Sequence, residues 1–180
     1  MAIKSLEQLI NELVINIDNS INIDNSINID NSINIDNLIN IDNLINIVSS
    51  YNSDDWMNYY PSTEEFNKNK NLYGYQKKLI HTNEQFEMYL IYWSPFACSP
   101  IHDHPDRGCI MKLLDGKLNE ELYLNKNSKI EYLKTVTINI NDINNRFGNE
   151  TLHKIINLNN FSISLHVYFP PKFKQNIYKV

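Results

Sequence analysis

The stretch "SPIHDHPDRGCIMKLLDG", residues 99–116, decides the fold of this chain. It places His102 and His104 one residue apart, then Cys109 after four more residues and a glycine after a further six. Side chains alternate across a β-strand, so the two histidines point to the same side and can share one metal ion. Asp103 points the other way and is not expected to be a ligand. An isolated His-x-His pair equally fits two hydrogen-bonded surface histidines, so other parts of the chain must distinguish the two interpretations.

Length, composition and charge restrict the classes of protein that this chain can belong to. Its 180 residues suffice for one domain with a sizeable core, and 42% of them are apolar. The net charge of -5, without a basic block, argues against a nucleic-acid binder. The start "MAIKSLEQLINELV" has no signal-peptide pattern, and no apolar run is long enough to cross a bilayer. We therefore expect a soluble, cytoplasmic protein whose two cysteines are free thiols, and the excess of Asn and Ile suggests an AT-rich genome.

The N-terminal part of the chain combines a helical pattern with a repeat. Residues 1–14 contain "SLEQLINELV", in which Ser5 and Gln8 have capping-box spacing and the apolar residues recur at helical spacing, so we expect a short amphipathic helix. The hexapeptide "INIDNS" then recurs and becomes "INIDNL" over residues 15–47. Hexapeptide repeats can form β-helices, but this tract has no glycine for the turns. We expect a low-complexity insertion without chemistry, with an extended helix or a loosely packed excursion left open.

The third part, residues 48–180, is expected to hold a few helices followed by a β domain. Asp54 or Asp55 is expected to cap one helix, and Thr63 a second short one. Beyond residue 72, short runs rich in Ile, Tyr, Leu and Val alternate with turn signals such as "DG" and "NKNS". This pattern predicts a β-sandwich or small β-barrel.

The histidine spacings resemble the two signature motifs of the cupin superfamily. The first motif reads His-x-His, a short gap to Glu and six residues to Gly, and the second contains His-x-x-x-Asn, which "HKIIN" from His153 matches. Where most cupins have the glutamate ligand, this chain has Cys109. The resemblance implies a mainly β, jelly-roll-like small barrel after N-terminal helices, and a metal held by three neutral histidines, His102, His104 and His153.

The cysteine in place of the glutamate makes the chain similar to the cysteine dioxygenases, the thiol dioxygenase branch of the cupins. The resemblance covers about Tyr73 to Pro171 and includes "SLHVYFPP", in which Ser164, His166 and Tyr168 alternate and so share one face of a strand. It implies that Tyr168 orients substrate and oxygen near the metal, positioned by the other two residues. Cys109 stands where animal members carry a thioether bond to this tyrosine, so the same crosslink is expected here.

The expected substrate site departs from the family pattern. Tyr75 matches a family tyrosine, but Lys77 stands where the family has the arginine that binds the substrate carboxylate. A lysine offers a point charge and not a planar fork, so the exchange is not conservative. Trp93 fits the strand leading to the site and completes the expected substrate-binding set. Arg107 is a second candidate cation, although a solvated loop residue is the plainer interpretation.

The resemblance implies an Fe(II)-dependent enzyme, with one iron per chain, that converts L-cysteine and O2 to cysteine sulfinate. Lys77 keeps open a related small thiol such as 3-mercaptopropionate, and the repeat keeps open a non-catalytic metal-binding cupin. The chain ends about a dozen residues after Tyr168, where the family usually continues, so part of the site's cover is expected to be missing or supplied otherwise. We expect a monomer without nucleic-acid or membrane partners, His81 in a surface loop, and a structural role for Cys98.

Overall fold

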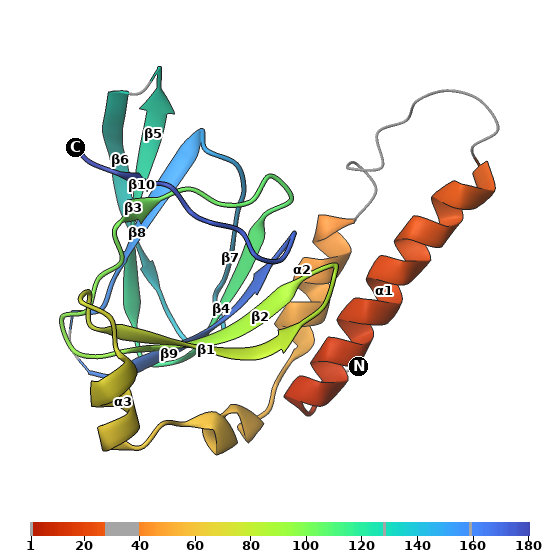
Figure 1. Cartoon of the computed structure of the whole chain (residues 1–180), viewed down its shortest axis with the longest axis horizontal. Helices are drawn as coiled ribbons and strands as arrows, with labels where there is room; N and C mark the ends of the chain where they lie inside the picture. The colour runs from red at the N-terminus through yellow and green to blue at the C-terminus, as the bar shows by residue number, and fades with distance from the viewer. Residues whose placement is uncertain (1, 28–39, 128, 159) are drawn as a thin grey trace. The chain divides into compact units, whose positions relative to one another are not determined.

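The computed structural model describes four stretches of the chain, residues 2–27, 40–127, 129–158 and 160–180. The chain forms two compact units, Met1–Tyr60 and Pro61–Val180. The first unit contains helices and the second contains one helix and all the strands. Figure 1 labels these elements.

Helix α1 (Leu6–Ile27) begins after Ser5, whose hydroxyl accepts a hydrogen bond from the Gln8 backbone N–H at 3.0 Å. The Gln8 side chain accepts from the backbone N–H of Lys4 and not from that of Ser5, so the predicted reciprocal capping box is wrong by one residue. The helix continues into the hexapeptide repeat, of which residues 28–39 lie outside the described part of the chain. Its buried side chains recur at helical spacing: Leu6, Leu9, Leu13 and Ile17.

The other elements of the first unit are helix α2 (Ile41–Ser50) and the short 3-10 helix η2 (Asp55–Tyr59). The predicted helix after Asp54 or Asp55 is therefore only a 3-10 segment, and Asp54 makes no side-chain capping bond. The Asp55 carboxylate instead accepts a hydrogen bond from the Tyr51 hydroxyl at 2.6 Å and one from a backbone N–H at the start of α1 at 2.8 Å. An aspartate at this position suggested a helix cap, but the Asp55 carboxylate makes these tertiary contacts instead.

Helix α3 (Thr63–Asn69) opens the second unit with a complete capping box. The Ser62 hydroxyl accepts from the Glu65 backbone N–H, and the Glu65 carboxylate accepts from the Ser62 backbone N–H at 2.9 Å. The capping residue is thus Ser62, and the prediction of Thr63 is wrong by one position.

The rest of the second unit consists of strands in two antiparallel sheets. One sheet has the order β1-β2-β9-β4-β7 and the other the order β10-β3-β8-β5-β6. The strands are β1 (Tyr75–Thr82), β2 (Glu87–Trp93), β3 (Ile101–His102), β4 (Cys109–Asp115), β5 (Leu118–Lys126), β6 (Lys129–Ile138), β7 (Ile143–Arg146), β8 (Thr151–Ile156), β9 (Ser162–Tyr168) and β10 (Ile177–Tyr178).

The two sheets pack face to face, because one buried hydrophobic cluster draws side chains from both (Figure 1). The central strand β9 is buried along its whole length, as expected for a strand covered on both faces. The predicted mainly β, cupin-type fold after N-terminal helices is confirmed. The cluster contains Tyr75, Ile91, Trp93, Ala97, Met111, Leu113, Leu118, Ile138 and Ile155.

Strand register brings distant parts of the sequence together. In one sheet His102 of β3 lies directly opposite His153 of β8, and in the other Cys109 of β4 lies opposite Tyr168 of β9. Each pair joins residues about 50 to 60 positions apart in the chain. The candidate site therefore forms only when both sheets are in this register.

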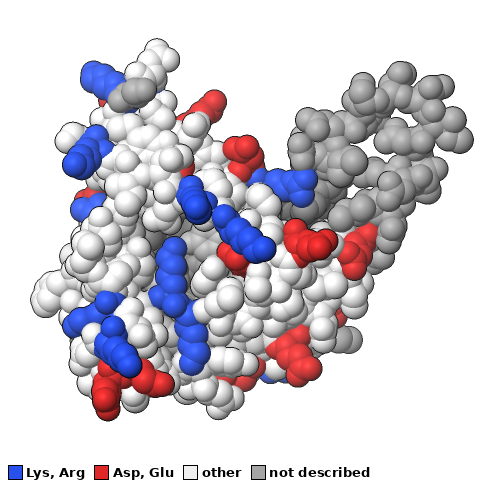
Figure 2. Space-filling model, viewed as in Figure 1, with Lys and Arg blue, Asp and Glu red and all other residues white. Residues whose placement is uncertain are grey.

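The surface drawn in Figure 2 and the helices of the described chain bear on charge and membrane crossing. On the face drawn in Figure 2, Lys and Arg side chains stand in small groups between uncharged surface. No helix among the described residues is long and apolar enough to cross a membrane.

Candidate metal centre

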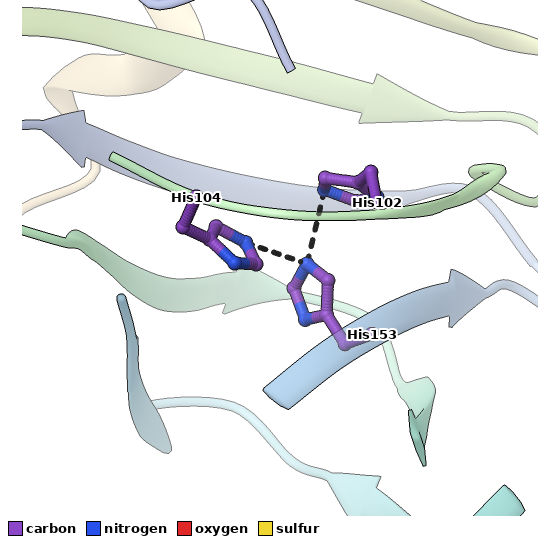
Figure 3. Close-up of side chains that lie close together, drawn as sticks. All are labelled: His102, His104 and His153. Carbon is purple, nitrogen blue, oxygen red and sulfur yellow. Dashed lines mark hydrogen bonds between the residues drawn. The ribbon is translucent and has the colours of Figure 1, made fainter. Parts of the chain in front are cut away.

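Three histidine side chains converge on one point of the second unit. His102 ends β3, His104 follows two residues later, and His153 projects from the neighbouring β8. Figure 3 shows the three rings turned toward one another. The Nε2 atom of His153 lies 3.0 Å from Nε2 of His104 and 3.1 Å from Nε2 of His102. The structure thus brings together the three residues that the sequence predicted as metal ligands.

Outer hydrogen bonds set the tautomers of two of these rings. Nδ1 of His102 donates to the carbonyl oxygen of Pro100 at 2.9 Å, and Nδ1 of His153 donates to the carboxylate of Glu120 at 2.7 Å. Carbonyl and carboxylate oxygens only accept, so each Nδ1 carries the hydrogen and each Nε2 keeps its lone pair. Nδ1 of His104 is buried without a hydrogen-bond partner among the described residues.

Burial keeps the three rings neutral. Their exposed fractions are 6%, 3% and 4% for His102, His104 and His153. Desolvation lowers the pKa of His102 to about 4, and it lowers the pKa of His104 and of His153 well below the usual value, with a further contribution from the neighbouring histidines. The Nε2 lone pairs are therefore available to a cation at neutral pH.

The geometry and the donor set fit a bound transition metal. Imidazole ligand atoms lie about 2.1 Å from a metal, so two of them at a right angle around it are about 3.0 Å apart. The two shortest Nε2–Nε2 distances, 3.0 and 3.1 Å, agree with this spacing. Imidazole nitrogen suits Fe, Zn, Cu and Ni, so the ligand type indicates a transition metal without choosing among them.

A buried carboxylate that the sequence analysis missed lies behind one of the ligands. Glu120 of β5 is fully buried, and its carboxylate accepts hydrogen bonds from His153 and from Arg146 of β7, whose Nε and Nη2 lie 2.9 and 2.6 Å away. A signal was present, because Glu120 occupies the inward-facing position between Leu118 and Leu122 in "KLNEEL". A carboxylate on the apolar face of a strand needs a buried partner.

Asp103, between the first two ligands, fastens the C-terminal strand beside them. Its carboxylate accepts from the backbone N–H and the side-chain amide of Asn176, both at 2.7 Å, and from the Tyr178 hydroxyl at 3.1 Å. Strand β10 pairs with β3 next to these bonds. Asp103 therefore supports the ligand-bearing strand from outside the metal centre.

The β9 residues that were predicted to share one face form a buried chain of polar contacts. This β9 row consists of Ser164, His166 and Tyr168. The indole N–H of Trp93 donates to the Ser164 hydroxyl oxygen at 2.8 Å, and this oxygen lies 2.8 Å from Nε2 of His166. Nδ1 of His166 lies 3.8 Å from the sulfur of Cys109, and the His166 ring stacks over Tyr168 with centroids 6.0 Å apart. Trp93, predicted to bind substrate, is buried beneath this row and supports Ser164.

Cys109 and Tyr168 lie side by side on adjacent strands, and their side chains hydrogen-bond to each other. Burial raises the pKa of the Cys109 thiol to about 12, and it raises the pKa of Tyr168 well above its usual range. Both groups are therefore protonated at neutral pH. The positive charge of Lys77 opposes the rise for the Cys109 thiol.

Tyr75 and Lys77 share one face of β1 but make different contacts. The Tyr75 ring packs on Trp93 with centroids 4.8 Å apart and belongs to the hydrophobic core. The Lys77 ammonium lies 5.5 Å from the centre of the Tyr168 ring and close enough to His102 to lower the pKa of that histidine. No carboxylate among the described residues lies within ion-pair distance of Lys77. Its charge therefore faces the metal centre and is available to a ligand.

Three other residues discussed from sequence are not members of the three-histidine cluster. His81 belongs to strand β1, so the prediction of a surface loop is wrong. Arg107 is half-buried in the turn between β3 and β4. Cys98 is a half-buried free thiol whose backbone bridges to Ile156.

Comparison with known proteins agrees with this site. The sequence matches the family model described as cysteine dioxygenase type I over residues 5–179. The chain belongs to this family. The family match covers the three histidines, the β9 row and Lys77 together.

Individual relatives match a shorter part of the chain. Cysteine dioxygenase type 1 of Rattus norvegicus is 32% identical over 108 residues, covering 55% of this chain and 52% of the rat protein. The Danio rerio protein of the same name is 30% identical over 136 residues, covering 69% of this chain and 62% of the fish protein. The chain of this cysteine dioxygenase family member thus matches about half the length of the rat relative.

A solved structure supports the fold alone. The crystal structure of Peruvianin-I, a cysteine peptidase from Thevetia peruviana latex, superposes with a TM-score of 0.50 at 9% identity. It covers 68% of the present family member and 82% of its own chain. At this identity the likeness concerns only the arrangement of the strands.

Proposed function

We propose that this member of the cysteine dioxygenase family is an Fe(II)-dependent dioxygenase that oxidises L-cysteine to cysteine sulfinate. The thiol loses its proton and the sulfur gains both atoms of O2, so that one thiol and one O2 give one sulfinate and one proton. The observation that supports this proposal is the position of the three-histidine centre opposite Lys77 and Tyr168. One chain supplies all three histidines, which supports one iron per chain.

The ligand set suits an anionic sulfur ligand. His102, His104 and His153 are neutral donors, so they leave the charge of a bound Fe(II) uncompensated. Bound iron would coordinate the thiolate and activate O2. The three ligands are at most 6% exposed, which limits the access of bulk water to the metal-binding side of the site.

Lys77 is the proposed partner of the substrate carboxylate. Its ammonium carries no ion pair with a described carboxylate, and it lies near both His102 and the Tyr168 ring. A single ammonium binds a carboxylate with less directional control than a guanidinium fork does. This difference favours a second candidate substrate, 3-mercaptopropionate, which shares the thiol and the carboxylate but has no amine to orient.

Tyr168 is the proposed group that orients the substrate and the oxygen. Its ring is held by the stack on His166, and His166 is held by Ser164, which Trp93 fixes in turn. Its raised pKa keeps the Tyr168 hydroxyl protonated, so it can donate a hydrogen bond to an anionic group.

A thioether between Cys109 and Tyr168 is a further part of the proposal. The C–S bond would form at the expense of the S–H bond and one ring C–H bond, with O2 as the two-electron oxidant that takes up both hydrogens as H2O2. Their position as register partners supports it. The crosslinked chain is lighter by two hydrogen atoms, which intact-protein mass spectrometry measures before and after incubation with iron, cysteine and O2.

The first experiment is oxygen consumption by protein loaded with iron under anaerobic conditions and then given L-cysteine and labelled O2. We expect stoichiometric uptake and a cysteine sulfinate that carries two labelled oxygen atoms. Uptake with 3-mercaptopropionate but not with cysteine would change the substrate and keep the reaction. Bound iron without uptake for either thiol would overturn the proposal in favour of a non-catalytic metal-binding cupin.

The cellular setting proposed for this reaction is the reducing cytoplasm. Both cysteines, Cys98 and Cys109, are free thiols in the structure. Free thiols are the usual state in a reducing compartment, which supports this location.

A further inference from the structure

The three metal-binding histidines differ in what holds their outer nitrogen. His102 donates to a neutral carbonyl, His104 has no described partner, and only His153 donates to a carboxylate, that of Glu120. A hydrogen bond from a ligating imidazole to a carboxylate fixes the tautomer and ring orientation and makes the ligand more basic. The three ligands are therefore not equivalent, and His153 is expected to be the strongest donor.

The Glu120 carboxylate is itself held by four hydrogen bonds from three residues. Besides Nδ1 of His153 at 2.7 Å, it accepts from Nε and Nη2 of Arg146 at 2.9 and 2.6 Å and from the Asn144 amide at 2.9 Å. The two Arg146 bonds go to different carboxylate oxygens, which is the paired geometry of a guanidinium fork. Glu120 has no freedom to turn away from His153 while these bonds are intact.

The ion pair between Glu120 and Arg146 also joins the two sheets. Glu120 lies on β5 of the ligand-bearing sheet, whereas Arg146 and Asn144 lie on β7 at the edge of the other sheet. Arg146 also lines a cavity of about 510 Å³ together with Asp106, Phe147 and Glu150, so its outer side is near solvent. A buried ion pair is weak grounds for stability, because desolvation offsets most of its attraction. Its connection to a ligand suggests another role.

We propose that Glu120, clamped by Arg146, is a positioning residue that holds His153 as an Nε2 donor and strengthens metal binding. This inference rests on the proposed function only in that the three histidines bind a metal; it requires no turnover.

The test measures metal affinity with Co(II) and Zn(II), by competition with a chelator, in the full-length protein. E120Q keeps the shape of the side chain, but its amide NH2 faces a guanidinium that cannot accept a hydrogen bond. We expect E120Q to weaken binding of both metals about 10- to 100-fold. The matched control is E121Q, since Glu121 is the next residue of β5, faces the opposite side and pairs with Lys154 next to His153. We expect E121Q to leave the affinity unchanged.

A second readout separates positioning from a general loss of structure. In the Zn(II) form, nitrogen-15 NMR should show Nδ1 of His153 protonated in a strong hydrogen bond, and E120Q should weaken that signal while the signal of His102 stays. If circular dichroism shows that E120Q does not fold, R146K replaces it as the test variant. R146K leaves Glu120 in place but removes the two parallel guanidinium hydrogen bonds. R146K should then give a smaller loss in the same direction.

The coupling between the two residues is tested with the double variant. If Arg146 acts through Glu120, then E120Q/R146M loses no more metal affinity than E120Q alone. Equal metal affinity of E120Q and E121Q, or additive losses in the double variant, would overturn the inference. Failure of the dioxygenase assay would not, since the metals and the readouts used here require no thiol and no O2.

Discussion

The two sheets of the β unit carry different halves of the candidate site, and their polar groups are held to different degrees. On the sheet with β3, β5 and β8, the outer nitrogens of His102 and His153 are fixed by bonds of 2.9 and 2.7 Å. On the sheet with β1, β4 and β9, Lys77 has no carboxylate partner among the described residues and the Cys109 sulfur is 3.8 Å from His166. The outer nitrogens of two metal ligands are thus fixed on the first sheet, whereas the second sheet keeps the Lys77 ammonium without a carboxylate partner beside residues that are themselves fixed, Ser164 and His166.

This difference suggests how the chemistry is divided. A metal site needs donors fixed within fractions of an ångström, which the strand register and the outer hydrogen bonds provide. A substrate site needs an unpaired charge that a ligand can take up. We therefore expect substitutions on the first sheet to affect metal binding, and those on the second to affect substrate use at unchanged metal affinity.

The largest expected effect comes from removing a ligand. H153A should abolish stoichiometric metal binding, because two imidazoles do not complete the site and Glu120 is left without its histidine partner. The control H166A lies in the other sheet and should keep a full complement of metal, measured by elemental analysis of the purified protein. Full metal occupancy in H153A would show that His153 is not a required ligand, and it would contradict the assignment of metal binding to the first sheet.

The next effect concerns Lys77 on the second sheet. K77M should lower kcat/KM for L-cysteine about 10- to 100-fold, because a hydrogen bond to a charged group contributes about 1.5–3 kcal/mol and each 1.4 kcal/mol is tenfold. It should leave the turnover of 2-aminoethanethiol, which has no carboxylate, nearly unchanged. K78M removes the same charge from the next residue of β1, whose side chain faces the opposite side, and should have little effect on either thiol.

A result in which K77M also loses metal would contradict the division between the sheets. Equal losses of kcat/KM for L-cysteine and 2-aminoethanethiol would show that Lys77 does not bind the carboxylate of L-cysteine. Steady-state oxygen uptake, with metal content measured on the same samples, distinguishes these outcomes.

The strand-rich fold and the shared face of His102 and His104 were predictable from local periodicity, whereas the full set of metal ligands came from the family resemblance. Two histidines at i and i+2 share a face of any strand, and short apolar runs between turn signals predict strands without knowledge of their partners. His153 came from a motif spacing, and its register opposite His102 confirms that the two motifs meet. These inferences needed no tertiary information beyond the family resemblance.

The parts that were missed depend on contacts between distant residues. Glu120 and Arg146 are 26 positions apart on different sheets. The sequence of neither strand indicates that the two side chains pair. The carboxylate of Asp55 in η2 likewise bonds outside its own segment, to Tyr51 and to the start of α1. Trp93 lies on the expected strand, but only its bond to Ser164 shows that it supports the site from beneath.

The smallest expected effect is a pH dependence of carboxylate binding at Lys77, on the second sheet. Desolvation by the surrounding protein lowers the pKa of the Lys77 ammonium below its usual value, although the residue is partly exposed at the surface and nearby Cys109 and Glu87 oppose the shift. Lys77 binds a carboxylate only while protonated, so affinity should be constant at lower pH and fall as the pH rises through this lowered pKa. Propionate is a suitable probe, because as a competitive inhibitor without a thiol it reports the carboxylate subsite alone.

The K77R variant sharpens this prediction. A guanidinium stays charged at any pH that the protein tolerates, so the inhibition constant of propionate should stay level in K77R where it rises in the unaltered protein. Metal affinity should be the same in both proteins across that range, since the histidine pKa values are lowered and their rings stay neutral as the pH rises. Coincident propionate profiles for the two proteins would mean that another group holds the carboxylate. The half-buried Arg107 would then be the next residue to substitute.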